Sequence, residues 1–198
     1  SGTLIRAETN TTGIFTFENN TSVGHSGTTD WTYGNGLCAY SSQHGSLNGE
    51  FTGNTLLDNR YGIQHYRYYG YKSADSVTID SNTALNSRTE GIRYYLHYGY
   101  GGSVLIKSNT VTNTLGGPGI NAYRNRYSNS DWLNVELDGN TCTDNNGRGI
   151  QSYYSSSGNI KISAHHNTCS DNGHDGLYIS GGNQCEAHQN VVHGNAEA

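Results

Sequence analysis

The sequence has no methionine, a single proline and few charged residues, which make up 14% of its 198 positions. A single proline excludes collagen-like and proline-rich chains, which need proline throughout. No apolar run approaches the ~18 residues of a membrane-spanning helix, and the first residues lack the basic and apolar blocks of a secretory signal peptide. We therefore expect no membrane span, and an exported form of this chain would already have lost its signal.

Glycine, tyrosine and small polar residues dominate what is present. The chain has 27 glycines and 16 tyrosines, and aromatic residues amount to 11%. A formal net charge of -5 is small and the aromatic content is high, which argues against disorder. Asn, Ser, Thr and Gly separate short β-branched or aromatic runs, whereas lysine and leucine, which favour helices, are scarce. The composition therefore predicts an all-β protein with one domain.

The composition also favours a secreted or cell-surface location. Lysine is rare, and glycosylation-type triplets begin at Asn10, Asn19 and Asn20. The cysteines form no CxxC pair and so predict no zinc site; they are Cys38, Cys142, Cys169 and Cys185. We expect no cofactor, and the sequence gives no support for calcium.

An internal repeat organises the chain. The pair Asn-Thr recurs in steps of 34, 28, 27, 31, 27 and, to a degenerate last copy, 23 residues; its asparagines are Asn20, Asn54, Asn82, Asn109, Asn140, Asn167 and Asn190. A Gly-Ile or Gly-Leu pair keeps the same phase; its glycines are Gly36, Gly62, Gly91, Gly119, Gly149 and Gly176. Two markers in one phase over some six copies indicate a solenoid or a propeller.

Apolar residues occupy fixed places in each repeat. Five and three residues before the asparagine they alternate with polar residues, as Val104 and Ile106 do before Asn109. Such alternation is typical of a strand with one buried face. A second apolar column stands two residues after the asparagine, and a third begins at the Ile or Leu of the second marker. We therefore predict three short parallel strands per turn, with equivalent residues stacked ~4.8 Å apart.

This pattern resembles the right-handed parallel β-helix repeat, also called the carbohydrate-binding and sugar-hydrolysis repeat of the pectate-lyase-like superfamily. The resemblance covers about residues 14–193. It implies a solenoid of about six to seven coils with three parallel sheets. It also implies an inward amide ladder, formed here by Asn54, Asn82, Asn109, Asn140 and Asn167. The architecture hosts lyases, hydrolases, epimerases, phage tailspikes, adhesins and inactive scaffolds, so it implies a fold and leaves the activity open.

The register predicts the environment of each cysteine. Cys142 and Cys169 share an inward column, where they are either small buried apolar residues or a disulfide. Cys185 also points inward, whereas Cys38 points outward and is the expected free thiol. Outward His165 and His188 share another column near Glu186 and His166. A solvated polar surface explains these histidines more simply than a metal site does, so we expect no metal there.

The strand after the second marker carries the candidate binding face. Its outward column reads Tyr40, Tyr66, Tyr95, Tyr123 and Tyr153. Such a column would form a stripe ~20 Å long that stacks either on sugar rings or on itself, stiffening the sheet. Residues 60–126 hold 8 basic and 3 acidic side chains, against 3 basic and 13 acidic elsewhere. We therefore expect the stripe to bind an extended acidic polysaccharide, with anionic groups held by Arg67, Arg93, Arg124 and Arg126.

Catalysis on such a ligand would centre on Arg93, Tyr95 and His97, which alternate outward on one predicted strand. Proton abstraction beside a uronate carboxylate needs a neutralising cation, here Arg93, and a base, here Tyr95 or His97. The outward columns that start at the second marker contain no Asp or Glu. A lyase or epimerase is therefore favoured over a glycoside hydrolase, which needs paired carboxyls. A sequence pI near 5.9 argues against nucleic acid as the partner.

A structural role is the rival hypothesis. We expect a single domain over residues 1–198, in which the repeat starts by Gly13 and runs until His193, with no helical segment outside it to cap the ends. Either the chain is a piece of a longer protein, or its end coils stack on other subunits. Open head-to-tail stacking builds filaments. The alternative function is therefore a non-catalytic structural or adhesive subunit of an extracellular filament, sheath or fibre.

Overall fold

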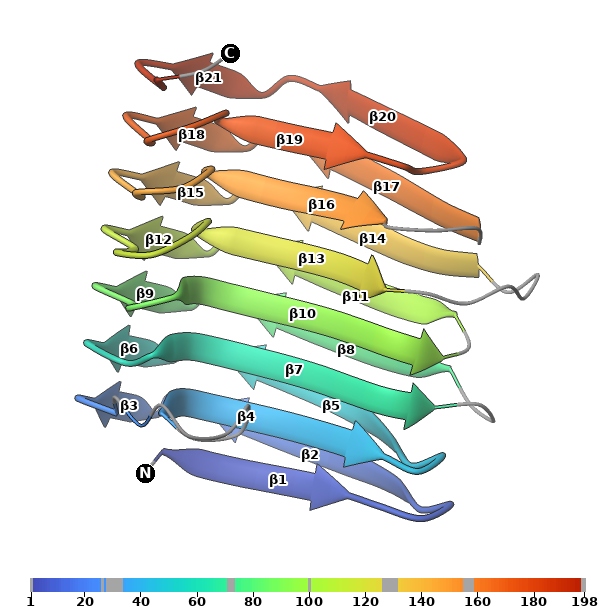
Figure 1. The fold of residues 1–198 in the computed structure, drawn as a ribbon. Helices are drawn as coiled ribbons and strands as arrows, with labels where there is room; N and C mark the ends of the chain where they lie inside the picture. The colour runs from blue at the N-terminus through green and yellow to red at the C-terminus, as the bar shows by residue number, and fades with distance from the viewer. Residues whose placement is uncertain are drawn as a thin grey trace.

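The computed structural model describes residues 2–25, 27, 34–70, 74–99, 101–125, 132–154 and 159–196, with the backbone alone at 69–70 and 98–99. These residues form a parallel β-solenoid of three seven-stranded sheets without any helix (Figure 1). The predicted fold, an all-β right-handed parallel β-helix with three sheets, is thereby confirmed. Within the same ranges, the structure contains no helix that could cross a bilayer.

Each turn of the chain contributes one strand to each sheet, and the turns are stacked along one axis. Sheet A contains β1 (Thr3–Ala7), β4 (Asn35–Ser42), β7 (Tyr61–Gly70), β10 (Glu90–Gly99), β13 (Ile120–Asn125), β16 (Ile150–Tyr154) and β19 (Leu177–Ser180). Sheet B contains β2 (Thr12–Glu18), β5 (Ser46–Thr52), β8 (Asp75–Asp80), β11 (Gly102–Lys107), β14 (Trp132–Asp138), β17 (Asn159–His165) and β20 (Gln184–His188). Sheet C contains β3 (Thr21–Val23), β6 (Thr55–Leu57), β9 (Thr83–Leu85), β12 (Thr110–Thr112), β15 (Thr141–Thr143), β18 (Thr168–Ser170) and β21 (Val191–His193).

A left-handed residue makes the bend between sheets B and C. It stands directly before the repeated asparagine, as Gly53 (φ 65°) and Gly139 (φ 63°) do before Asn54 and Asn140. Glycine adopts this backbone conformation without the steric penalty that a Cβ atom brings. The bend therefore aims each asparagine side chain at the equivalent residue of the next coil.

The repeated asparagines form the expected ladder inside this bend. The Nδ2 of Asn82 donates to the Oδ1 of Asn109 at 2.9 Å, and Asn109 donates in the same way to Asn140 at 3.0 Å. A second ladder, which the sequence analysis missed, lies five positions further on, where Asn145 donates to Asn172 at 2.9 Å. Both ladders satisfy buried amide groups that would otherwise be costly to leave unpaired.

The apolar columns form one continuous core between the sheets. The register of sheet B places Val77, Val104, Val135 and Ile162 in line on consecutive strands, and all of them are buried. Cys142 and Cys169 are paired neighbours on β15 and β18 and are also buried. Because each coil is only one strand deep, its core residues are covered mainly by the coils above and below.

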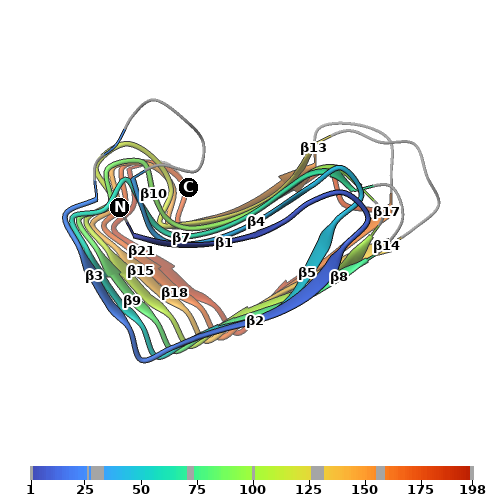
Figure 2. The same ribbon diagram turned by 90° about the horizontal axis from the view of Figure 1, so that it is seen from below.

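Sheet A has the longest strands and an unusual curvature. Its strands β7 and β10 have 10 residues each, whereas every strand of sheet C has 3. Viewed along the axis, the strands of sheet A curve so that their outer surface is concave (Figure 2). The candidate site lies on this concave surface.

Candidate functional site

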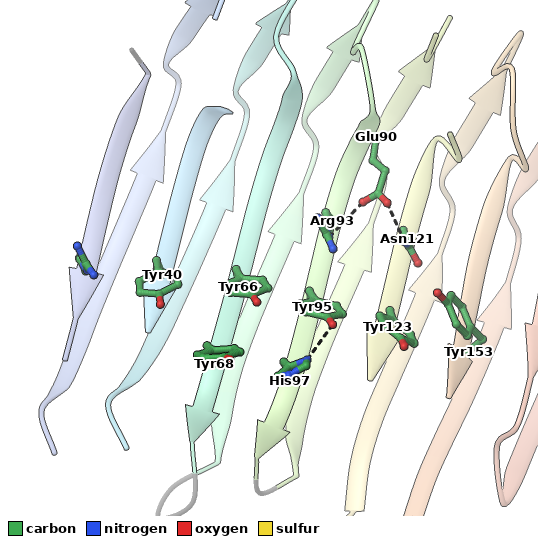
Figure 3. Close-up of a pocket in the computed structure, with 11 residues that line it drawn as sticks. Tyr40, Tyr66, Tyr68, Glu90, Arg93, Tyr95, His97, Asn121, Tyr123 and Tyr153 are labelled. Carbon is green, nitrogen blue, oxygen red and sulfur yellow. Dashed lines mark hydrogen bonds and ion pairs between the residues drawn. The ribbon is translucent and has the colours of Figure 1, made fainter. Parts of the chain in front are cut away.

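A groove runs across the outer face of sheet A, parallel to the solenoid axis. It has a volume of about 620 Å³ and is lined by Arg6, Tyr40, Tyr66, Tyr68, Glu90, Arg93, Tyr95, His97, Asn121, Tyr123 and Tyr153. These residues come from six adjacent strands, β1, β4, β7, β10, β13 and β16 (Figure 3). At ~4.8 Å per strand, the groove extends roughly 24 Å. We call it the sheet A groove.

The five predicted tyrosines form a continuous stack along this groove. Ring centroids are 5.6 Å apart for Tyr40 and Tyr66, 4.9 Å for Tyr66 and Tyr95, 5.0 Å for Tyr95 and Tyr123, and 4.2 Å for Tyr123 and Tyr153. Adjacent rings are within 26° of parallel. In-register strands set this spacing, and aromatic rings at this distance prefer to stack on one another.

The stack leaves ring edges, and few ring faces, for a ligand. Tyr66 and Tyr95, in the middle of the stack, are only 7% and 8% exposed. The expectation that the ring faces are open to sugars is therefore wrong for these inner tyrosines, because each inner ring is covered by its neighbours. At one end, the guanidinium of Arg6 lies 5.1 Å from the centre of the Tyr40 ring.

Arg93, Tyr95 and His97 lie together on β10 and all line the groove, as predicted. The hydroxyl of Tyr95 lies 2.9 Å from the Nδ1 of His97, and the Nδ2 of Asn125 lies 3.2 Å from each of these two atoms. An amide nitrogen can only donate, so Nδ1 accepts and His97 carries its proton on Nε2. Tyr95 therefore donates to His97, which is the arrangement needed to draw a proton from the phenol.

Glu90 is one of the groove residues that the sequence analysis missed, together with Arg6, Tyr68 and Asn121. Its Oε2 lies 3.4 Å from the Nε of Arg93, and its Oε1 accepts a hydrogen bond of 3.0 Å from the Nδ2 of Asn121. Burial raises the pKa of the Glu90 carboxyl, although Arg93 and the hydrogen bond from Asn121 act in the opposite direction. Glu90 stands directly before Gly91 of the second marker, one position outside the columns that were compared.

A row of polar side chains fixes the orientation of Asn121. The Nε2 of Gln151 donates to the Oδ1 of Asn121 at 3.5 Å, and the Nη1 of Arg148 donates to the Oε1 of Gln151 at 2.8 Å. Arg148 is itself paired with Asp175, with Nε 2.6 Å from Oδ2. Because Asn121 accepts through its oxygen, its nitrogen is directed at Glu90.

Two of the arginines assigned to the binding face lie inside the coil. The Nη1 of Arg67 is 2.9 Å from the Oδ1 of Asp75, and the Nη1 of Arg124 donates to the backbone oxygen of Asn159 at 3.0 Å. Both side chains are fully buried. Strands β7 and β13 continue past their outward tyrosines, so the next residue on each strand points inward. The predicted ligand contacts of Arg67 and Arg124 are therefore wrong, and Arg126 lies outside the described residues.

The predicted environment is confirmed for two of the four cysteines. Cys142 and Cys169 are inside, as predicted, and both are free thiols. Cys38 is not the accessible thiol, since it is buried with its Sγ 3.8 Å from the Oε1 of Gln64, and burial raises its pKa to about 12. Cys185 is exposed instead, because β20 is the outermost strand of sheet B.

The outer face of sheet B carries the histidine cluster. The Nδ1 of His165 lies 2.9 Å from the Nε2 of His188, and Ser163 hydrogen-bonds to both His165 and Glu186. In the described part of the chain, no three His, Cys, Asp or Glu side chains are placed to hold a metal ion together. Of the residues that line the sheet A groove, Glu90 alone carries a carboxylate, which fits calcium poorly because this ion takes six to eight oxygen ligands.

Comparison with known proteins supports the fold. The family model described as a right handed beta helix region matches residues 130–198. The same three-sheet stacking continues through the described residues before position 130. No curated protein and no solved structure matches the chain. A right-handed β-helix is a fold found generally in carbohydrate-binding and sugar-active proteins.

Proposed function

We propose that this right-handed parallel β-helix protein binds an extended polysaccharide in the sheet A groove. The observation that carries the proposal is the shape of the groove, which is open, about 620 Å³ in volume and lined by six consecutive strands. A small metabolite would need a compact pocket closed on several sides. An extended polymer instead uses a surface that repeats along one direction, as coils of a solenoid do.

Hydroxyl and amide groups supply the contacts in this proposal. The tyrosine stack presents ring edges to the groove, and Asn121 and His97 add polar groups beside it. Burial raises the pKa of Tyr153 to about 12 and also raises that of Tyr66, so both hydroxyls keep their protons. They can therefore donate to and accept from sugar hydroxyls.

An acidic polysaccharide, which is cleaved or epimerised, is the second candidate. Arg6 and Arg93 are the arginines in the lining of the groove, and either could hold a carboxylate. The hydrogen bond from Tyr95 to His97 favours proton abstraction, with Tyr95 as the base after it transfers its proton to His97 and with Arg93 as the neutralising cation. The secreted or cell-surface location expected from composition is part of both candidates.

A non-catalytic structural or adhesive subunit remains the rival. The observation that favours it is the tyrosine stack itself, whose rings contact each other and so stiffen sheet A without any ligand. In this case the groove binds no sugar.

Replacing Tyr66, Tyr95 and Tyr123 together with phenylalanine tests the proposal. Phenylalanine keeps the stacked rings and removes the hydroxyls, each of which contributes about 1 kcal/mol when hydrogen-bonded. We expect binding to the recognised glycan on a panel of neutral and acidic polysaccharides to weaken by about 100-fold, while the melting temperature changes little.

The matched control is Tyr178→Phe. Tyr178 lies on β19 against Arg148, outside the groove lining, so this variant should bind like the parent. A parent protein that binds no polysaccharide, or a triple variant that binds as well as the parent, would favour the structural role.

A further inference from the structure

We infer that Glu90 sets the ligand specificity of the sheet A groove, because its carboxylate neutralises Arg93 and repels acidic sugars, so that the groove prefers uncharged sugars to uronic acids. This inference rests on the proposed function, since it names the class of polysaccharide that the groove accepts. It also separates the two polysaccharide candidates above. The four contacts of Glu90 and Arg93 described next carry it.

Arg93 is held by the protein within the groove. Besides the Glu90 contact, its Nη1 donates to the hydroxyl of Tyr61 at 2.9 Å. Its guanidinium carbon lies 4.7 Å from the ring centre of Tyr95 and 5.2 Å from that of Tyr61. The side chains of Arg93 and Glu90 are only 11% and 12% exposed. A sugar carboxylate that approached this guanidinium would have to compete with the Glu90 carboxylate, which is already paired with it.

Glu90 is fixed beside Arg93 by groups that favour its negative charge. Asn121 donates to it (Figure 3). The row through Gln151 and Arg148 keeps the Asn121 amide in that orientation. Across the strands, the neighbouring titratable groups are the phenols of Tyr61 on β7 and Tyr153 on β16. The second carboxylate oxygen, Oε2, is buried without a hydrogen bond. The charge of this carboxylate repels a ligand carboxylate in the groove and does not repel a ligand hydroxyl.

The other cations in the middle of the chain do not offset Glu90. Arg67 and Arg124 are buried inside the coil. On sheet B, the Nζ of Lys107 lies 3.3 Å from the Oδ2 of Asp80. The remaining arginine in the described lining of the groove is Arg6, which lies on the edge strand β1. Its Nη2 is paired with the carboxylate of Glu8. Among the described residues of 60–126, Arg93 is therefore the one Lys or Arg in the lining of the groove.

The decisive experiment compares Glu90→Gln with the parent protein on chemically paired ligands. The probes are polyuronates, such as polygalacturonate and alginate, and the same polymers after their carboxyl groups are reduced to hydroxyls. The parent should prefer the reduced polymers. Glu90→Gln keeps the shape and the acceptor for Asn121 but lacks the charge, so polyuronate binding should strengthen about tenfold or more. Binding of the reduced polymers should stay within about twofold.

Two measurements guard against ambiguity. A circular dichroism spectrum and a melting curve establish that Glu90→Gln folds, and the parent protein supplies an independent test through its pH dependence. Lowering the pH protonates Glu90, so polyuronate binding by the parent should strengthen relative to the reduced polymer over the range in which the polyuronate stays ionised. This trend should be smaller in Glu90→Gln, in which His97 is the remaining acid–base group of the groove besides the tyrosines and arginines. The matched control is Asp80→Asn, which removes a carboxylate of sheet B outside the groove lining and should leave the preference unchanged.

The outcomes distinguish this inference from the proposed function. If the parent and the variant both bind reduced polymers and the variant gains nothing on polyuronates, the role of Glu90 is refuted while polysaccharide binding stands. A parent that prefers polyuronates also refutes it and favours the acidic candidate. If neither protein binds any polymer of the panel, the proposed function fails.

Discussion

Two arginine–carboxylate pairs on adjacent turns of the solenoid show how much the facing direction of a residue matters. Inside the coil, the Nη1 of Arg67 lies 2.9 Å from the Oδ1 of Asp75, and neither side chain is exposed. In the groove, the Nε of Arg93 lies 3.4 Å from the Oε2 of Glu90, and the two side chains are 11% and 12% exposed. The interior pair is closed off by packed side chains. The groove pair is within reach of a ligand. The same two residue types therefore contribute to the fold in one place and to recognition in the other.

The largest difference should appear when the carboxylate of each pair is removed. Asp75→Ala takes the acceptor from a buried guanidinium and leaves a cavity, so we expect it to lower the free energy of unfolding by about 3 kcal/mol or more. Glu90→Ala opens the Arg93 guanidinium to water in the groove and should cost less than about 1 kcal/mol. Urea denaturation of both variants measures the contrast. Equal losses would mean that the groove pair is structural as well.

A second contrast uses two tyrosines that follow one another on β10. Tyr95 faces the groove and donates to His97, whereas Tyr94 is buried and its hydroxyl has no hydrogen-bond partner. If the protein cleaves or epimerises a polyuronate, Tyr95→Phe should reduce turnover by about 100-fold or more, which is the usual contribution of a positioned base. Tyr94→Phe should leave turnover unchanged. Release of unsaturated product, followed by ultraviolet absorbance, and proton exchange from the polymer, followed by NMR, measure the two reactions.

The sequence predicted the parts of the fold that repeat. Two in-phase markers predicted the coil and the line of Tyr66, Tyr95 and Tyr123, because period and strand alternation depend only on order along the chain. The asparagine ladder was implied by the resemblance to the β-helix repeat. The inward direction of Arg67 could also have been predicted, since it follows an outward tyrosine. It was missed because Arg67 was assigned to the same binding face as the tyrosine before it.

Contacts between different turns were harder to predict. Cys38 points outward in the register but is covered beside Gln64, and Glu90 enters the groove from a position before the repeated marker. Both depend on which side chains of neighbouring coils meet, and that is decided by rotamers and strand curvature. The burial of the inner tyrosine faces also depends on contacts between neighbouring coils, because the rings stack on one another and leave few faces for a ligand.

The last predicted effect concerns the pH dependence of the interior pair. Burial raises the pKa of Asp75 to about 7, against the attraction of Arg67, from its ordinary value of 3.8. The folded protein therefore binds this proton more tightly than the unfolded chain does. This group stabilises the fold most fully below pH 3.8, and the contribution is lost as the pH rises through about 7.

His65, which lies 3.6 Å from Asp75, acts in the opposite direction. Burial lowers its pKa from 6.5 to about 3, so its contribution to stability is present above pH 6.5 and is lost as the pH falls toward about 3. Between about pH 4 and 6.5, the free energy of unfolding of the parent protein therefore changes little with pH, because the Asp75 and His65 contributions change in opposite directions. Asp75→Asn removes only the pH-dependent contribution of Asp75. The free energy of unfolding of this variant, relative to that of the parent, should therefore increase steadily as the pH rises from about 4 to about 7. Urea denaturation at several pH values measures this difference, and a constant difference between the two proteins would show that Asp75 is ionised throughout that range.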